Sequence, residues 1–464
     1  MATSTSSPAT PLLPAAATSG DTTGNEDTGS SSRRAYFLFL GMGLATLLPW
    51  NLFISASEFY QYQFAGSTHQ QTFQNSFSVT YMVTNLAFNI YAMLTVTKTS
   101  PNARILYGLV ANTLAYIVGV FMPLMGDYRG SLSFYIAISQ LAVTAAASGL
   151  LTNSTFALVA HFPPSHAEGV LSGQAVAGII AAAAQLATAY SVSPVGSAQG
   201  SARLARGPAV AEGGSGGLIP RTIAYFAFAT VTNVALTVAF LYVKHDPYYA
   251  QKSKLACPAH DQVEGGNRSE AGDSQPILSE ATTSAPAFSL DTGVFRSTFS
   301  QISGYSYVIL LDFALTLAVF PSVTALVTST TGFRLLTEWH FFIFNVGDFL
   351  GRRFAPSLPI SSIPSLLGIA FSRFLFIPVF FLCHVSFSVW YNWITSDLSF
   401  LVLVLLLGAT NGYLSTRSAM IAPALSDHPT IAGTIVAISI STGLAIGSIF
   451  SWPVRAAGCL CSPF

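Results

Sequence analysis

The stretch Leu401-Val402-Leu403-Val404-Leu405-Leu406-Leu407 contains no polar side chain. A transmembrane β-strand alternates apolar and polar residues over about ten positions, whereas a helix that crosses a bilayer needs about 20 predominantly apolar residues. The unbroken run lies inside a longer apolar segment at residues 396–423, so it predicts a transmembrane helix and not a strand. Comparable segments recur along the chain, and the predicted fold class is therefore all-α and integral to a membrane.

The composition agrees with this class. Of the 464 residues, 51% are hydrophobic and only 8% are charged, whereas soluble domains carry charge on about 25% of their residues. The 19 basic and 19 acidic residues cancel, so the chain has no net basic field to hold nucleic acid through counterion release. Nucleic acid is therefore excluded as a partner, and the expected partner of most of the surface is the lipid bilayer.

No pattern of catalytic or metal-binding residues stands out. The sequence contains no HExxH, GxSxG or P-loop motif. Its four cysteines, Cys257, Cys383, Cys459 and Cys461, are too scattered for a disulfide framework or a zinc site. We therefore expect a protein that is not an enzyme and that needs no cofactor.

Hydropathy predicts eleven crossings, which divide into six and five around a long polar link. The crossings are expected near residues 35–56, 74–97, 103–124, 132–160, 168–190, 221–243, 303–327, 337–352, 360–384, 396–423 and 430–453. The predicted domains are a disordered cytoplasmic tail at 1–34, a six-helix bundle at 35–243, a cytoplasmic loop at 244–302, a five-helix bundle at 303–453 and an extracellular tail at 454–464.

The distribution of Lys and Arg predicts the orientation. With the N-terminus inside, the inner segments hold eleven of these residues and the outer segments hold six, and cytoplasmic loops carry the excess of positive charge. The N-terminus is therefore expected in the cytoplasm. With an odd number of crossings the C-terminus is expected outside the cell, and the expected location is the plasma membrane.

The eighth predicted crossing carries the strongest candidate site. Asn345, Asp348 and Arg352 follow one another at i, i+3 and i+7 and so share one helix face, where Asp348 can pair with Arg352. Ionisable groups inside the hydrocarbon are costly, and each is a functional-site hypothesis. A carboxylate beside a guanidinium could bind a neutral solute rich in hydroxyls, such as a ribose. A purely structural ion pair within the helix accounts for the spacing equally well.

Weaker candidates lie in three other crossings. Trp50 and Asn51 follow a helix-bending Pro49 and could stack on a planar ring, although an aromatic anchor at the membrane surface is the plainer interpretation. Gln174 follows two small residues and could reach a cavity or simply accompany close helix packing. Phe320 precedes a proline and could gate a path or mark a kink.

Three further charges at membrane depth need partners. Asp312 lies in the seventh crossing, Arg373 in the ninth and Arg417 in the tenth. For each of them an ion pair with another helix is a better expectation than contact with a solute. The small residues from Gly443 to Gly447 are expected to form a helix-packing face.

Several of these segments together resemble the equilibrative nucleoside transporter family. Any one motif is modest, but six in order across nearly the whole membrane portion are specific. The matching stretches are Leu47-Leu48-Pro49-Trp50-Asn51, Ser172-Gly173-Gln174 with Ala177-Gly178, Phe320-Pro321-Ser322-Val323-Thr324, Phe344-Asn345 through Asp348 to Gly351-Arg352, Asn411-Gly412-Tyr413-Leu414-Ser415, and Ala432-Gly433-Thr434 through Gly443-Leu444-Ala445.

The resemblance implies a fold like that of the major facilitator superfamily with one helix fewer. It implies facilitative transport of nucleosides, or nucleobases, by alternating access. We expect the chain to be functional as a monomer. The resemblance also implies that Asp348 and Arg352 bind the ribose and that Trp50 packs near the base. The remaining lining or gating residues that it implies are Asn51, Gln174, Phe320 and Asn345.

The chain departs from the family in the fourth crossing. Where members commonly place a glutamine that faces the cavity, the sequence reads Thr152-Asn153-Ser154, so Asn153 is the candidate substitute for contact with the base. A secondary transporter of another small polar solute or of an organic cation, with or without proton coupling, remains the alternative. The selectivity between purines such as adenosine, pyrimidines and free bases stays open.

Overall fold

The computed structural model describes residues 22–70, 73–96, 98–124, 130–192, 215–256, 292–385 and 391–459. Its first half contains α1 (Thr22–Ser55), α2 (Ser57–Gln63), α3 (Phe73–Leu94), α4 (Pro101–Phe121), α5 (Ser131–Val159), α6 (Pro164–Val192), α7 (Ser215–Val243) and α8 (Pro247–Ala256). Its second half contains α9 (Thr292–Val319), α10 (Leu336–Phe354), α11 (Ile363–Ser372), α12 (Phe376–Phe381), α13 (Asp397–Ile421) and α14 (Pro429–Cys459).

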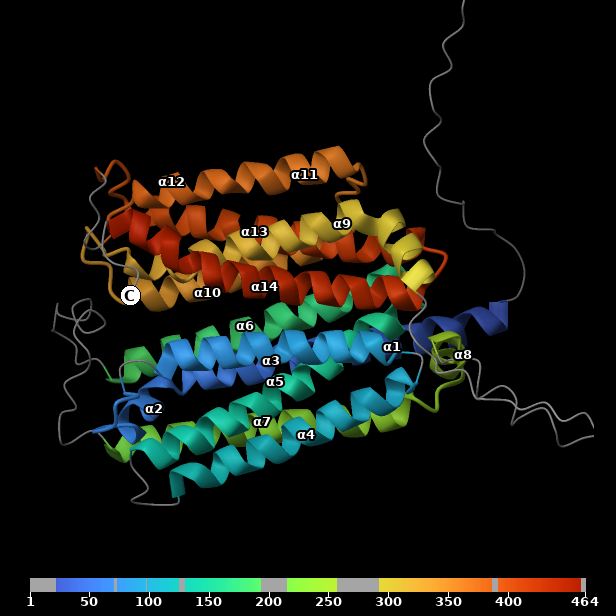
Figure 1. Ribbon diagram of the computed structural model, residues 1–464, viewed down its shortest axis with the longest axis horizontal. Helices are drawn as coiled ribbons and strands as arrows, with labels where there is room; N and C mark the ends of the chain where they lie inside the picture. The colour runs from blue at the N-terminus through green and yellow to red at the C-terminus, as the bar shows by residue number, and fades with distance from the viewer. Residues whose placement is uncertain are drawn as a thin grey trace, which may run out of the picture.

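The long helices form two bundles that lie side by side (Figure 1). One bundle contains the long helices from α1 to α7, and the other contains α9 to α14. The bundles meet where α6 packs on α10 and α13, and where α14 packs on α3 and α5. The short helix α8 lies at one end of the molecule and α2 at the other; these are called the α8 end and the α2 end below.

The predicted all-α membrane fold is confirmed. Within the described residues, ten helical segments are long and apolar enough to cross a membrane. Helix α10 is not among them because its 19 residues include Glu338, Asp348, Arg352 and Arg353. It nevertheless lies along α13 of the second bundle and α6 of the first, and counting it gives eleven crossings, six before α8 and five after.

The ends of several predicted segments are wrong. Helix α1 begins at Thr22, inside the tail expected at 1–34, and α9 begins at Thr292, inside the loop expected at 244–302. Helix α14 continues to Cys459, into the tail expected at 454–464, and the helix α8 within the expected loop was not predicted. Hydropathy locates the part of a helix that meets lipid, whereas backbone hydrogen bonds let the helix continue into water. Residues 1–21, 257–291 and 460–464 of these predicted tails and loop lie outside the described residues.

The ninth crossing is interrupted. It was expected as one segment at 360–384, but α11 ends at Ser372, a 3₁₀ turn follows at Arg373–Leu375, and α12 resumes at Phe376. The interruption falls at Arg373, whose side chain is fully buried. The guanidinium is thereby directed into the second bundle instead of toward lipid.

Glycines bring α10 and α13 into backbone contact. A Cβ atom on Gly351 would lie 2.0 Å from the carbonyl oxygen of Ala409, and one on Gly412 would lie 1.9 Å from that of Asp348. Gly347 and Gly408 lie one turn away on the same two helices, and a Cβ atom on either would lie 2.4 or 2.3 Å from a carbonyl oxygen of the opposite helix. Each helix therefore carries a G-x-x-x-G pattern, which permits close approach in a membrane, and this approach sets Asp348 against α13.

The predicted packing face on α14 lies against α9. A Cβ atom on Gly443 would meet the carbonyl oxygen of Leu310, and one on Gly447 that of Ala314. In the first bundle, Gly173 of α6 packs in the same way on the backbone of Leu40 in α1. Close helix packing therefore accounts for the small residues that precede Gln174.

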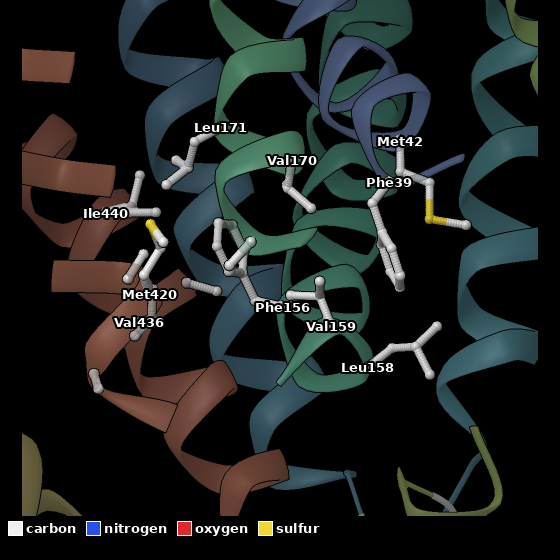
Figure 2. Packing of buried hydrophobic residues seen from close by; sticks show 14 of the residues in the cluster. Phe39, Met42, Phe156, Leu158, Val159, Val170, Leu171, Met420, Val436 and Ile440 are labelled. Atoms are coloured by element: carbon white, nitrogen blue, oxygen red, sulfur yellow. The ribbon is translucent and has the colours of Figure 1, made fainter. Parts of the chain in front are cut away.

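An apolar cluster joins the two bundles toward the α8 end. Figure 2 shows Phe156 and Leu171 of the first bundle directed toward Met420, Val436 and Ile440 of the second. All five side chains are buried, Met420 with 8% of its surface exposed and the other four with 5% or less. The bundles are therefore closed against each other at this end.

One polar contact reinforces this closure. His161, in the turn between α5 and α6, lies 2.7 Å from the Oγ1 atom of Thr430 in α14. Burial and the nearby charge of Lys252 lower the pKa of His161 below its usual value. The imidazole is therefore neutral at pH 7, and one of its ring nitrogens shares a hydrogen bond across the two bundles.

The glycine contact gives a prediction about stability. Gly412→Ala should lower the free energy of unfolding by about 2 kcal/mol, since the new methyl group must push α10 away from α13. Gly368→Ala is the matched control, because no described atom beyond its own stretch of helix lies within 4 Å of the position of its Cβ, and alanine is favoured over glycine in a helix. Thermal unfolding in detergent measures both variants, and equal melting temperatures would contradict the packing described.

Candidate functional site

Asp348 and Arg352 form an ion pair inside the second bundle. The Nε atom of Arg352 donates to Oδ2 of Asp348 at 2.8 Å, and the two side chains are 4% and 6% exposed. The pair spans one turn of α10, as the i+4 spacing predicts. Breaking it would leave a charge unpaired in an apolar interior, at a cost of about 3 kcal/mol or more.

Helix α13 supplies a second partner to the carboxylate. Asn411 donates from Nδ2 to Oδ1 of Asp348 at 2.7 Å. Each carboxylate oxygen therefore accepts one hydrogen bond and keeps capacity for another. On the other side of the ion pair, Nη1 of Arg352 is buried without a hydrogen-bond partner among the described residues. The pair thus presents open acceptor and donor positions together.

A second ion pair lies on neighbouring helices. Arg373 donates from Nη1 to the carboxylate of Asp312 in α9, and both side chains are completely or almost completely buried. Nη2 of Arg373 donates to Oγ1 of Thr316 at 2.7 Å, and Thr316 lies 2.8 Å from Oδ1 of Asn411. The expectation that Asp312 and Arg373 find partners on other helices is confirmed. Arg417 instead donates from Nε to the carbonyl oxygen of Ile360.

Two more predicted residues lie on or against α10. The ring of Phe320 stacks on that of Phe344, with centroids 3.9 Å apart and planes 15° from parallel. Asn345 donates to the carbonyl oxygen of Phe341 in its own helix, and its carboxamide packs on Gly178 of α6. Asn345 therefore lies at the contact between the two bundles.

The first bundle holds a separate group of predicted residues. The ring of Trp50 lies 5.1 Å from that of Tyr81 in α3. Beside it on α1, Nδ2 of Asn51 is buried and has no partner among the described residues. Gln174 donates to Oγ1 of Thr46 at 3.2 Å and so links α6 to α1.

Asn153 has the least satisfied side chain of the predicted set. It is fully buried in α5, yet neither atom of its carboxamide has a hydrogen-bond partner among the described residues. Unpaired buried polar atoms are rare and each calls for an explanation. A ligand that donates and accepts hydrogen bonds would satisfy both atoms.

The structure reveals polar residues that sequence reasoning missed. Glu168 of α6 is buried and accepts from the hydroxyls of Tyr36 and Ser172. Thr316 was not singled out, and Asn411 was quoted only as part of a motif. The available signal was their polarity inside long apolar segments, but their partners lie on other helices and cannot be read from spacing along the chain.

Two solved structures share this architecture. The human organic anion transporter MFSD10 aligns with a TM-score of 0.53 at 14% identity, over 92% of this chain and 95% of its own. The major facilitator superfamily proton:xylose symporter XylE also aligns at 0.53, with 13% identity, over 92% and 88%. Both alignments show that this chain shares the two-bundle fold of these transporters.

The sequence comparison identifies the family. A family model described as nucleoside transporter matches residues 138–456. Human equilibrative nucleoside transporter 2 is 27% identical over 92% of this chain and 99% of its own length. The chain belongs to the nucleoside transporter family.

The buried ion pair gives a second prediction about stability. Arg352→Gln should destabilise the protein by about 3 kcal/mol, because Asp348 loses the cation that compensates its burial. The double variant Asp348→Asn with Arg352→Gln should lose less, since it removes both charges together. Melting temperatures in detergent compare the two, and a double variant that melts below the single one would contradict this account.

Proposed function

We propose that the chain carries nucleosides across the plasma membrane by facilitated diffusion, with Asp348 and Arg352 binding the ribose. The supporting observation is the ion pair itself, which combines unused carboxylate lone pairs with an unpaired guanidinium N–H. Ribose hydroxyls can donate to the first and accept from the second. Membership of the nucleoside transporter family supports the choice of this substrate.

The base is proposed to contact the first bundle. Trp50 offers an aromatic face for stacking, and Asn153 offers an unpaired donor and acceptor for a polar edge. A planar base and a polar sugar would then be held by different bundles. The residues proposed to line or gate this site are Asn51, Gln174, Phe320 and Asn345.

Alternating access is supported by the position of α10. This helix carries Asp348 and Arg352 and also packs on α6 of the other bundle. A substrate held by both bundles would therefore change the contacts between them as they rock. The apolar cluster at the α8 end closes one route to the site in this structure.

The proposed orientation places the α8 end in the cytoplasm. Lys and Arg are in excess in the segments on that side, and the described ones include Lys252 and Lys254 of α8. The C-terminus is then extracellular. A single chain contains the whole proposed site, so we propose that it functions as a monomer.

Uptake of labelled substrates tests the proposed function. Transport-deficient cells that express the native chain should take up labelled adenosine and uridine, and labelled hypoxanthine tests whether free bases are also carried. Asp348→Ala and Arg352→Ala should each reduce nucleoside uptake at least tenfold at equal surface expression, because each removes an ion–dipole contact to the sugar worth about 1.5–3 kcal/mol. Gly368→Ala, which changes no contact, is the matched control. Native rates in both variants would refute the site, and no uptake by the well-expressed native chain would refute the function.

A proton-coupled carrier of another solute or of an organic cation is the rival proposal. The pairing of Asp348 with Arg352 favours a neutral solute over a cation, because the carboxylate is already compensated. Vesicles with and without an imposed pH gradient distinguish the two mechanisms. Facilitated diffusion predicts the same initial rate of uridine uptake in both and no accumulation above equilibrium, whereas uphill accumulation driven by the gradient would establish coupling.

A further inference from the structure

A continuous line of hydrogen bonds joins the two buried ion pairs of the second bundle. It runs from Arg373 through Thr316 and Asn411 to Asp348 and connects the 3₁₀ turn after α11 with α9, α13 and α10. We propose that Thr316, backed by the ion pair of Arg373 and Asp312, positions Asp348 and thereby determines specificity for the sugar hydroxyls. This inference rests on the proposed binding of ribose by Asp348.

The orientation of Asn411 follows from its neighbours. Asp348 is an acceptor when ionised, so the Asn411 carboxamide must turn its Nδ2 group toward it, at 2.7 Å. Its Oδ1 atom then faces Thr316, at 2.8 Å. The carboxamide can hold this orientation firmly only if Thr316 donates its hydroxyl proton to that oxygen.

The surroundings of Thr316 favour this donation. The hydroxyl has one proton and two oxygens within reach, Oδ1 of Asn411 and the backbone oxygen of Asp312, both at 2.8 Å. The backbone oxygen also accepts from Arg373 Nη1 at 3.1 Å, and Arg373 Nη2 fills an acceptor position of the hydroxyl. Donation to Asn411 therefore satisfies its Oδ1 atom, which has no other donor among the described residues.

All donors in this line then point the same way. Arg373 donates to Thr316, Thr316 to Asn411, and Asn411 to Asp348. The guanidinium of Arg373 therefore polarises a line of hydrogen bonds that ends on the carboxylate of Asp348. Successive hydrogen bonds of one direction strengthen one another in a medium of low dielectric constant. Thr316 and Asn411 are 2% and 3% exposed, so water offers little competition along this route.

The hydrogen bonds that reach Asp348 from Arg373 affect how the carboxylate recognises the sugar. A substrate that draws Arg352 away leaves Asp348 with Asn411 as its remaining described partner. The line of hydrogen bonds from Arg373 would then hold the carboxylate in place and directed at the sugar. Asp312 compensates the charge of Arg373, so the second ion pair serves as a fixed support that does not itself touch the substrate.

A purely structural role makes the opposite prediction at Thr316. Valine has nearly the shape of threonine, so a packing role tolerates Thr316→Val and is weakened by Thr316→Ser, which loses a methyl group. A positioning role is lost in Thr316→Val and retained in Thr316→Ser, because only the hydroxyl carries the hydrogen bonds. The two substitutions therefore separate the hypotheses.

The measurement is the ability of unlabelled uridine and of 2′,3′-dideoxyuridine to inhibit uptake of labelled uridine. The half-inhibitory concentration of 2′,3′-dideoxyuridine divided by that of uridine reports recognition of the hydroxyls and does not depend on expression. Thr316→Val should reduce this ratio about fivefold, the value of one hydrogen bond of about 1 kcal/mol, and Thr316→Ser should retain it. Thr410→Val is the matched control, because within the described residues that hydroxyl bonds only to its own helix, at Leu406 and Leu407.

The reference variant Asp348→Asn separates the proposed sugar site from the positioning role of Thr316. A reduced ratio in Asp348→Asn together with a native ratio in Thr316→Val would overturn the positioning role alone. Equal losses in Thr316→Val and Thr316→Ser would also overturn it, in favour of packing. A native ratio in Asp348→Asn would overturn the proposed sugar site and the positioning role together.

Discussion

The burial of four charges within one apolar bundle is the constraint on which the rest of the structure depends. Asp312, Asp348, Arg352 and Arg373 are all buried. Buried ion pairs contribute little net stability, since desolvation offsets their attraction. The bundle accommodates them by pairing every charge and by linking the pairs through Thr316 and Asn411. Such an arrangement is explained better by recognition of a polar ligand than by stability.

Backbone contact between α10 and α13 makes this compensation geometrically possible. Without side chains at Gly351 and Gly412 the helices approach closely enough for Asn411 to reach Asp348. The same helix α10 also packs on α6 through Asn345 and Gly178. The proposed site is therefore built on rigid elements and lies beside the surface along which the two bundles meet, which suits a carrier that responds to its substrate.

Sequence reasoning predicted the membrane class, the number of crossings and the face shared by Asn345, Asp348 and Arg352. These features depend on local properties, namely the length of apolar runs and the period of the helix. The ends of the helices were predicted less well, as Thr22 and Thr292 show. Backbone hydrogen bonding continues a helix beyond the apolar segment, so hydropathy does not mark where it stops.

The sequence by itself determined that the chain spans a membrane, that it divides into six and five crossings, and that Asp348 can pair with Arg352 one turn away. Only the tertiary structure decided that Arg373 pairs with Asp312, because residues 61 positions apart meet through helix packing. It likewise decided that Thr316 and Asn411 connect the two ion pairs. A helix imposes its period on its own residues but not on its neighbours, and the partners of buried charges are fixed by the packing between helices.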